Sequence, residues 1–218
     1  MIQASDRTRA AMICGLALLL AATSGCRKSS TVAEYDVLSA FVDNEFVIKT
    51  GVKPTGQESD RITKVVISNS TESDQHGSYV LRDGNGQPVP WAQIASSLQK
   101  EDPNLGQKTL DAFREANIRQ TSLQRLFHPA VDYEIVDDSS SQLRSVFRSG
   151  GWPAFYKLFP GSQGILTFSR VGFSPDGVQA LLYVKNRCGD LCGGSAYVVL
   201  ERHNDHWLIE KEIDEMVS

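Results

Sequence analysis

Two cysteines near the C-terminus form the residue pair best suited to chemistry. Cys188 and Cys192 stand in C-x-x-x-C spacing within the glycine-containing segment 187–194. An even pair in an oxidising compartment predicts a disulfide, which in so short a loop contributes about 2 kcal/mol in the entropic account. Catalytic dithiols are usually C-x-x-C at a helix start, where the dipole lowers a thiol pKa. A redox pair, metal ligands and free thiols are the alternatives.

Two histidines flank a short turn and form the other candidate site. His203 and His206 enclose Asn204 and Asp205, residues that tolerate the positive φ of a two-residue hairpin. The histidines would then face each other across the turn and could share a metal ion. Asp205 and Glu201 are the nearest further ligands in the sequence. A solvated hairpin tip that holds no ion is the alternative, because such tips collect polar residues.

Other nucleophile and cofactor patterns are absent from the sequence. Ser162 lies between Gly161 and Gly164, but these offsets do not match G-x-S-x-G. The sequence contains no Walker motif, no G-x-G-x-x-G and no H-E-x-x-H. His76 and His128 are interpreted as surface residues. We therefore predict no catalytic residue and no cofactor.

The C-terminal quarter predicts an antiparallel β-meander of about four strands. Hydrophobic residues alternate with polar ones there, which is the strand pattern. The turn at Ser174–Gly177 and the hairpin at 203–206 are short, so adjacent strands must run antiparallel. In the last strand Trp207, Ile209 and Ile213 are expected on one side. The predicted strands span residues 165–173, 178–185, 196–202 and 207–213.

The preceding part of the chain predicts mostly helices, which gives an α+β fold with helices packed on the meander. Thr31 and Glu34 fit a capping box at the start of the first helix. Asp102 and Pro103 fit an N-cap followed by Pro at the first helical position. The expected helices span 32–47, 91–98, 103–117, 141–148 and 152–159, and the expected strands span 61–68 and 131–136. The order of elements resembles the cystatin or NTF2-like shape, a likeness that carries no function.

The N-terminus has the features of an export signal. Arg7 and Arg9 precede the uncharged run 10–23, which is too short to span a bilayer and has the length of a secretory apolar region. The run ends in Thr23-Ser24-Gly25-Cys26. This resembles a bacterial lipoprotein signal, in which cleavage precedes a cysteine that is then lipidated. Thr23 and Asp6 depart from that pattern, and ordinary cleavage after a small residue is the alternative.

The resemblance implies a division of the chain and a location. Residues 1–25 would be a removed signal peptide, 26–30 a lipidated Cys26 with a tether, and 31–218 one domain. Loss of Arg7, Arg9 and Asp6 takes the formal net charge from −4 to −5, which gives no electrostatic basis for binding nucleic acid. The expected location is the cell envelope, facing the periplasm or exterior. The membrane would be reached through the lipid, and an envelope protein is a candidate partner.

The C-terminal half resembles a group of uncharacterised secreted proteins and lipoproteins of bacteria. The resemblance covers roughly residues 104–213. It rests on these segments: Gly151-Trp152, Phe155-Tyr156, Phe159-Pro160-Gly161-Ser162, Gly164, Ser169-Arg170-Val171-Gly172-Phe173, Gln179-Ala180-Leu181 and Cys188-Gly189-Asp190-Leu191-Cys192-Gly193. It implies family membership and no catalytic residues.

These observations favour a non-enzymatic binding or accessory role in the envelope. A hydrolase with a cleft between helices and sheet is one alternative. It would be favoured by a buried pocket that joins His203 or His128 to a carboxylate and a hydroxyl. A thiol–disulfide role of Cys188 and Cys192 is the other alternative.

Overall fold

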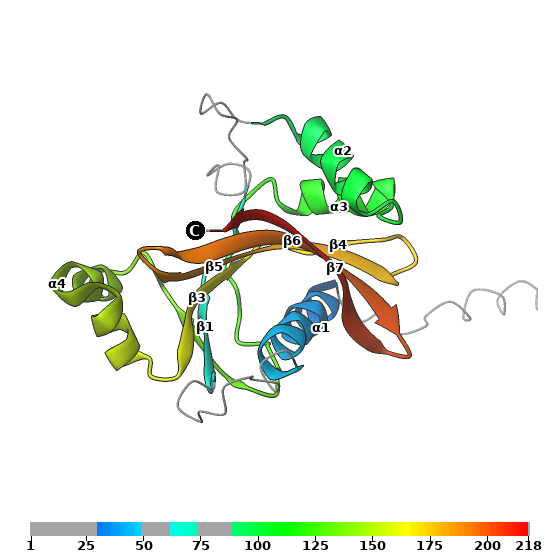
Figure 1. The fold of residues 1–218 in the computed structure, drawn as a ribbon. Helices are drawn as coiled ribbons and strands as arrows, with labels where there is room; N and C mark the ends of the chain where they lie inside the picture. The colour runs from blue at the N-terminus through cyan, green and yellow to red at the C-terminus, as the bar shows by residue number, and fades with distance from the viewer. Residues whose placement is uncertain (1–29, 49–61, 74–88, 218) are drawn as a thin grey trace, which may run out of the picture.

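The computed structural model describes residues 30–48, 62–73 and 89–217. The expected signal peptide, Cys26 and His76 lie outside these ranges, as does most of the tether. Within them the chain forms an α+β fold, as predicted, with helices around a seven-stranded mixed sheet (Figure 1).

The sheet is larger than the predicted meander of about four strands. Its order is β2-β1-β3-β5-β6-β7, with β4 also paired to β5. The antiparallel meander is present in β3, β5, β6 and β7, whereas β1 runs parallel to both β2 and β3. The strands are β1 Lys64–Ser68, β2 Asp132–Val136, β3 Ser162–Phe168, β4 Gly172–Phe173, β5 Gln179–Gly189, β6 Cys192–His203 and β7 His206–Val217. The predicted strand 165–173 is split into β3 and β4.

Helices cover both faces of the sheet. α1 lies on one face of the sheet, and α2 and α3 lie on the other. α4 packs against β1 and β3, at the end of the sheet away from α1 (Figure 1). The helices are α1 Ser30–Val42, which continues into the π-helix η1 Asp43–Ile48, α2 Trp91–Glu101, α3 Gln107–Ala116 and α4 Ser141–Leu158. The expected break after residue 148 is present inside α4, where Gly151 has a φ of 58°.

Strand alternation divides the core between the two faces. In β5, Ala180 and Leu182 belong to the cluster under α1, whereas Leu181 and Tyr183 belong to the cluster under α2 and α3. This is the period-two pattern of a strand that is buried on both sides. The same sheet therefore supports two separate helical layers.

Two predicted helix starts are wrong. Glu34 does not cap α1: its carboxylate accepts hydrogen bonds from Arg170 Nε (2.6 Å) and from the Val171 N–H (3.1 Å). Asp102 is the C-cap of α2, and α3 begins only after Gly106. The Asp102 carboxylate instead accepts from the Asn104 N–H at 3.0 Å, a local turn bond that competes with N-capping.

The prediction that Trp207, Ile209 and Ile213 share one side of β7 is wrong for Ile213. Trp207 and Ile209 pack under α1, but Ile213 packs with the α2–α3 cluster. The register between β6 and β7 shifts where Leu200 pairs with Ile209 and Val199 with Lys211. This bulge inserts Glu210, so the side chains beyond it change face.

None of the helices in the described ranges is long and apolar enough to span a membrane.

Candidate functional site

A groove of about 980 Å³ lies between α1 and the β6–β7 hairpin. We call it the α1–hairpin groove. Its walls are α1 with the start of η1, the β4–β5 turn, the hairpin tip, and the loop that carries His128. Figure 1 shows α1 beside the end of this hairpin. The lining residues are Ala33, Asp36, Ser39, Ala40, Asp43, Asn44, His128, Phe173, Ser174, Pro175, Asp176, Gly177, Arg202, Asp205, His206, Trp207 and Leu208.

One stripe of the first helix supplies a wall of the groove. Asp36, Ser39, Ala40, Asp43 and Asn44 stand at positions i, i+3, i+4, i+7 and i+8, so they share one helix face. Asn44 Nδ2 donates to Ala40 O (2.8 Å) and to Trp207 O (3.3 Å). The second bond ties this wall to β7 across the groove.

Backbone donors hold two of the carboxylates in place. Asp43 Oδ1 accepts from the Ala130 N–H at 2.7 Å. Asp176 Oδ1 accepts from the Ser174 hydroxyl at 2.5 Å and from the Val178 N–H at 3.3 Å. These bonds lower the pKa of Asp176 below its ordinary value, and the bond from Ser174 has the largest effect. They do so because they favour the charged form of the carboxyl group.

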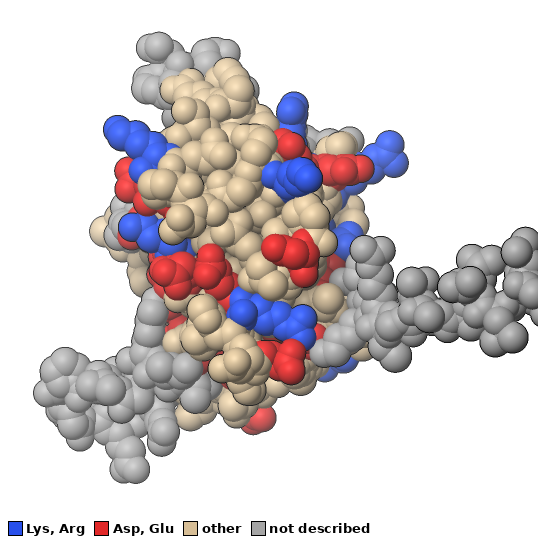
Figure 2. Space-filling view, turned by 90° about the vertical axis from the view of Figure 1, so that its right-hand side faces the viewer, with Lys and Arg blue, Asp and Glu red and all other residues tan. Residues whose placement is uncertain are grey.

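The hairpin tip adds an ion pair and an aromatic ring. Arg202 Nη2 contacts Asp205 Oδ1 at 2.5 Å. Asn204 and Asp205 have positive φ values of 48° and 69°, as predicted for the two-residue turn. Trp207 follows directly and packs against Phe173, with ring centroids 6.0 Å apart. On this end of the molecule acidic and basic side chains lie close together, below a largely uncharged area (Figure 2).

His128 lines the groove between a hydroxyl and a carboxylate. Its Nδ1 lies 3.4 Å from Ser39 Oγ, and its Nε2 lies 3.5 Å from Asp36 Oδ1. The His128 side chain is exposed, as expected from the sequence, but Ser39 is buried. Ser39 Oγ also accepts the His128 N–H at 2.9 Å. These are the groups named for the hydrolase alternative, but the exposed His128 does not place them in a buried pocket.

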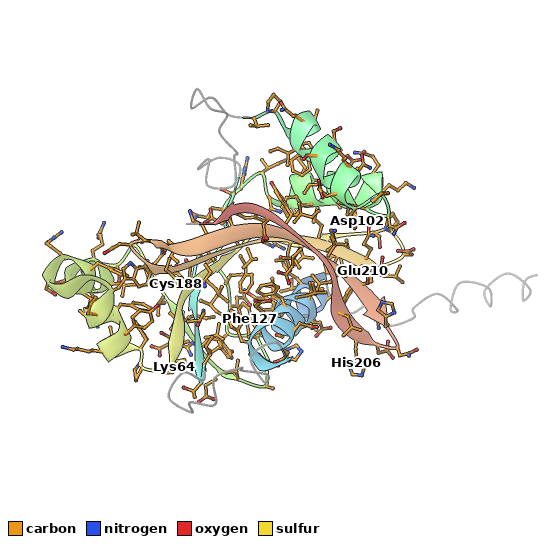
Figure 3. All side chains as sticks on the ribbon, in the orientation of Figure 1. Lys64, Asp102, Phe127, Cys188, His206 and Glu210 are labelled. Atoms are coloured by element: carbon orange, nitrogen blue, oxygen red, sulfur yellow. A yellow bond between two sulfur atoms is a disulfide. The ribbon has the colours of Figure 1, made fainter. Side chains whose placement is uncertain are left out.

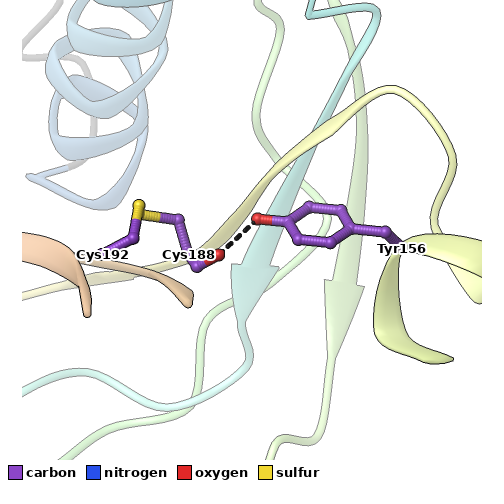
Figure 4. The surroundings of a disulfide bond; sticks show 3 residues. All are labelled: Tyr156, Cys188 and Cys192. Carbon is purple, nitrogen blue, oxygen red and sulfur yellow. Dashed lines mark hydrogen bonds between the residues drawn. A yellow bond between two sulfur atoms is a disulfide. The ribbon is translucent and has the colours of Figure 1, made fainter. Parts of the chain in front are cut away.

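The two cysteines lie at the opposite end of the sheet from the groove. Cys188 and Cys192 are joined by a disulfide with a Cα–Cα distance of 5.0 Å, in agreement with the sequence expectation. They close the β5–β6 hairpin, and Tyr156 Oη of α4 donates to Cys188 O at 2.7 Å (Figure 4). Burial raises the pKa of Tyr156 because it disfavours the phenolate.

The two histidines pair across the turn but point toward different groups. His203 and His206 are register partners. His206 lines the groove, whereas His203 lies with Glu201 and Glu210, with one ligand atom from each within 4.8 Å of the others. Glu210 lies farther from the tip than His206 (Figure 3). Glu210 was not foreseen as a neighbour because the bulge that exposes it depends on strand register.

Sequence reasoning missed the groove as a whole. The signal was present in part, since Asp36, Ser39 and Asp43 form a polar stripe beside the apolar stripe of the same helix. Nothing local to that helix indicates that Trp207 lies opposite. Ser162, the other serine considered, is the first residue of β3 and does not line the groove.

Comparison of the chain with protein families, with curated proteins and with solved structures gave no match.

Proposed function

We propose that this chain is a lipid-anchored envelope protein that binds a ligand in the α1–hairpin groove without chemically changing it. The observation that carries the proposal is the composition of the groove. It combines the aromatic surface of Trp207 and Phe173 with carboxylates held by fixed donors. Ligand sites are concave and combine apolar walls with a few positioned polar groups, at volumes of roughly 300–1,000 Å³.

The fixed geometry of the groove supports binding. Asp43 and Asp176 are held by backbone N–H groups, and Asn44 bridges α1 to the backbone of β7. Groups held in place before binding lose little conformational freedom when a ligand arrives, which favours affinity.

The groove would lie near the membrane if Cys26 carries the lipid. Only four residue steps separate Cys26 from Ser30, where α1 begins. A fully extended chain of that length spans at most roughly 14 Å. Ala33 and Asp36, in the first two turns of α1, already line the groove. The proposed ligand would therefore be met close to the membrane surface.

Native mass spectrometry of the full-length lipidated protein, purified in mild detergent from its own envelope, tests the proposal. We expect a defined excess mass that Trp207→Ala and Asp43→Asn both lose. Leu191→Ala is the matched control, because Leu191 is 90% exposed at the disulfide end, and it should keep the excess mass. An excess that persists in both groove variants, or none in the wild type, would contradict the proposal.

Hydrolysis is the second candidate, favoured by the contacts of His128 with Ser39 and Asp36. A base within reach of a hydroxyl, oriented by a carboxylate, is the arrangement that activates a serine. It ranks second because Ser39 lies inside α1, where backbone N–H groups are used in helical hydrogen bonds and so do not form an oxyanion hole. Ser39 Oγ also already accepts a backbone bond.

Labelling with a fluorophosphonate distinguishes the two candidates. A hydrolase would form an adduct on Ser39 that His128→Gln suppresses, with Ser162→Ala as a control that leaves it unchanged. The binding proposal expects no adduct on Ser39.

A further inference from the structure

We propose that the α1–hairpin groove selects an organic cation, a ligand that carries an amine or guanidinium group on an apolar body. This inference rests on the proposed binding function and adds the chemical class of the ligand. It follows from the charges of the lining residues, from the donors that hold them, and from the aromatic pair.

Carboxylates dominate the charged lining of the groove. Among the described residues, the groove is lined by four aspartates, one guanidinium and the imidazoles of His128 and His206, and by no lysine. Arg202 is already paired with Asp205. This pairing offsets the positive charge that would otherwise attract an anionic ligand. Asp36 lies beside His128, whereas the carboxylates of Asp43 and Asp176 give the groove a negative field that attracts cations.

The donors that position Asp43 and Asp176 are neutral. They are the N–H groups of Ala130 and Val178 and the hydroxyl of Ser174. Neutral donors fix a carboxylate in place without cancelling its charge. A ligand cation would therefore find oriented acceptors, and a charged group on either side strengthens such hydrogen bonds.

The aromatic pair suits the rest of such a ligand. Trp207 and Phe173 are both partly exposed, and their rings tilt at 56° to each other. An aromatic face attracts a cation and also covers an apolar body. Trp is the strongest such face among the side chains. The combination of aromatic faces with carboxylates distinguishes this groove from a purely apolar cleft, which would accept neutral ligands equally well.

A panel of three probes of similar shape and different charge tests the inference. The full-length protein in detergent micelles is titrated with 2-phenylethylamine, 2-phenylethanol and 3-phenylpropionate. Binding is followed by the indole N–H resonance of Trp207, assigned by its loss in Trp207→Phe. We expect a saturable shift with the amine, and affinity at least about tenfold lower for the alcohol and the carboxylate.

Two variants and a control sharpen the result. Asp176→Asn and Asp43→Asn should each weaken amine binding several-fold, whereas Asp190→Asn in the β5–β6 hairpin should leave it unchanged. Equal binding of the alcohol or the carboxylate would overturn the cation inference while leaving the groove as a binding site. A Trp207 resonance that responds to none of the three probes would also overturn it, and the native mass measurement would then decide the proposed function separately.

Discussion

The two ends of the sheet differ in how many aromatic side chains pack together. At the disulfide end, α4 packs a five-ring aromatic cluster onto Val66 and Ile165. Each ring centroid there lies within 6.0 Å of another. At the groove end, Trp207 and Phe173 form one pair, and both are partly exposed, as are Phe147, Trp152 and Tyr156 at the other end. The rings of the cluster are those of Phe147, Trp152, Phe155, Tyr156 and Phe159.

The two ends also differ in the groups that hold their carboxylates. At the disulfide end, Arg187 pairs with Asp138 at 2.7 Å, and Ser68 donates to the same carboxylate. The groove end has an ion pair too, between Arg202 and Asp205, but there neutral donors also hold Asp43 and Asp176. The comparison teaches that aromatic content alone does not mark a binding surface. The rings at the disulfide end lie in a larger cluster that stabilises the fold, whereas the Trp207–Phe173 pair lines the α1–hairpin groove that we propose as the ligand site.

The largest expected effect separates the two ends by stability. Phe155 is fully buried within the aromatic cluster, so Phe155→Ala should lower the free energy of unfolding by about 3–5 kcal/mol. Leu208→Ala in the groove should cost under about 1 kcal/mol, because that side chain is already 43% exposed. Urea unfolding followed by circular dichroism measures both. Equal losses would show that the groove end is also part of the stabilising core.

Removal of the disulfide should have the next largest effect. Cys188→Ser with Cys192→Ser should lower the free energy of unfolding by about 2 kcal/mol in the entropic account. It should leave ligand binding in the groove unchanged, since the cysteines lie at the other end of the sheet. Thermal unfolding under oxidising conditions measures the loss, with wild type in reductant as the matched control. A change in groove binding, or a redox phenotype, would instead favour the thiol–disulfide alternative.

A smaller effect concerns the alkaline stability of the disulfide end. Burial raises the pKa of Tyr156, so the folded state keeps this proton longer than the unfolded state, whose pKa is about 10. Its stabilising contribution is present below pH 10 and is lost as pH rises through the folded-state pKa.

Tyr156→Phe tests this contribution. The variant should lose about 1 kcal/mol at pH 7 with the bond to Cys188 O. It should then lose less stability than wild type above pH 10. Tyr35, whose pKa burial also raises, stays as an internal reference. Parallel losses in variant and wild type from pH 8 to 11 would contradict the account.

The smallest effect on the fold is expected from the hairpin histidines. The metal site predicted at His203 and His206 stays a prediction. The structure sharpens it, because His203 lies with Glu201 and Glu210 whereas His206 lines the groove. If this hairpin holds Zn²⁺, His203→Ala should abolish binding and His206→Ala should leave it unchanged. Isothermal titration with Zn²⁺ measures both. The reverse order of effects would place the site at the tip.

The parts of the fold that sequence could predict are those with local causes. Alternation in β5 and β6, and the two residues with positive φ at 204–205, depend only on neighbours along the chain. The parallel placement of β1 between β2 and β3 depends on contacts distant in sequence. The Asp102-Pro103 signal was misinterpreted because a local turn uses the same side-chain bond.

The candidate site was harder to predict because its walls come from distant segments. Asp36 and Trp207 meet across the groove although most of the described chain separates them. The sequence shows the polar stripe of α1, but it does not show which segment lies across the groove from that stripe. The aromatic segment at 152–159 was readable too, yet it forms a packed cluster. Distinguishing a packed cluster from a binding surface required the tertiary contacts.

Photo-cross-linking within the native envelope tests the central claim most directly. A benzoylphenylalanine placed at Leu208 reports on the groove, and one at Leu191 reports on the disulfide end. The account predicts that position 208 captures one defined small cationic species, lost in the Trp207→Ala background, and that position 191 captures none. Equal capture at both positions, or none at position 208, would contradict the claim that the α1–hairpin groove is the binding site.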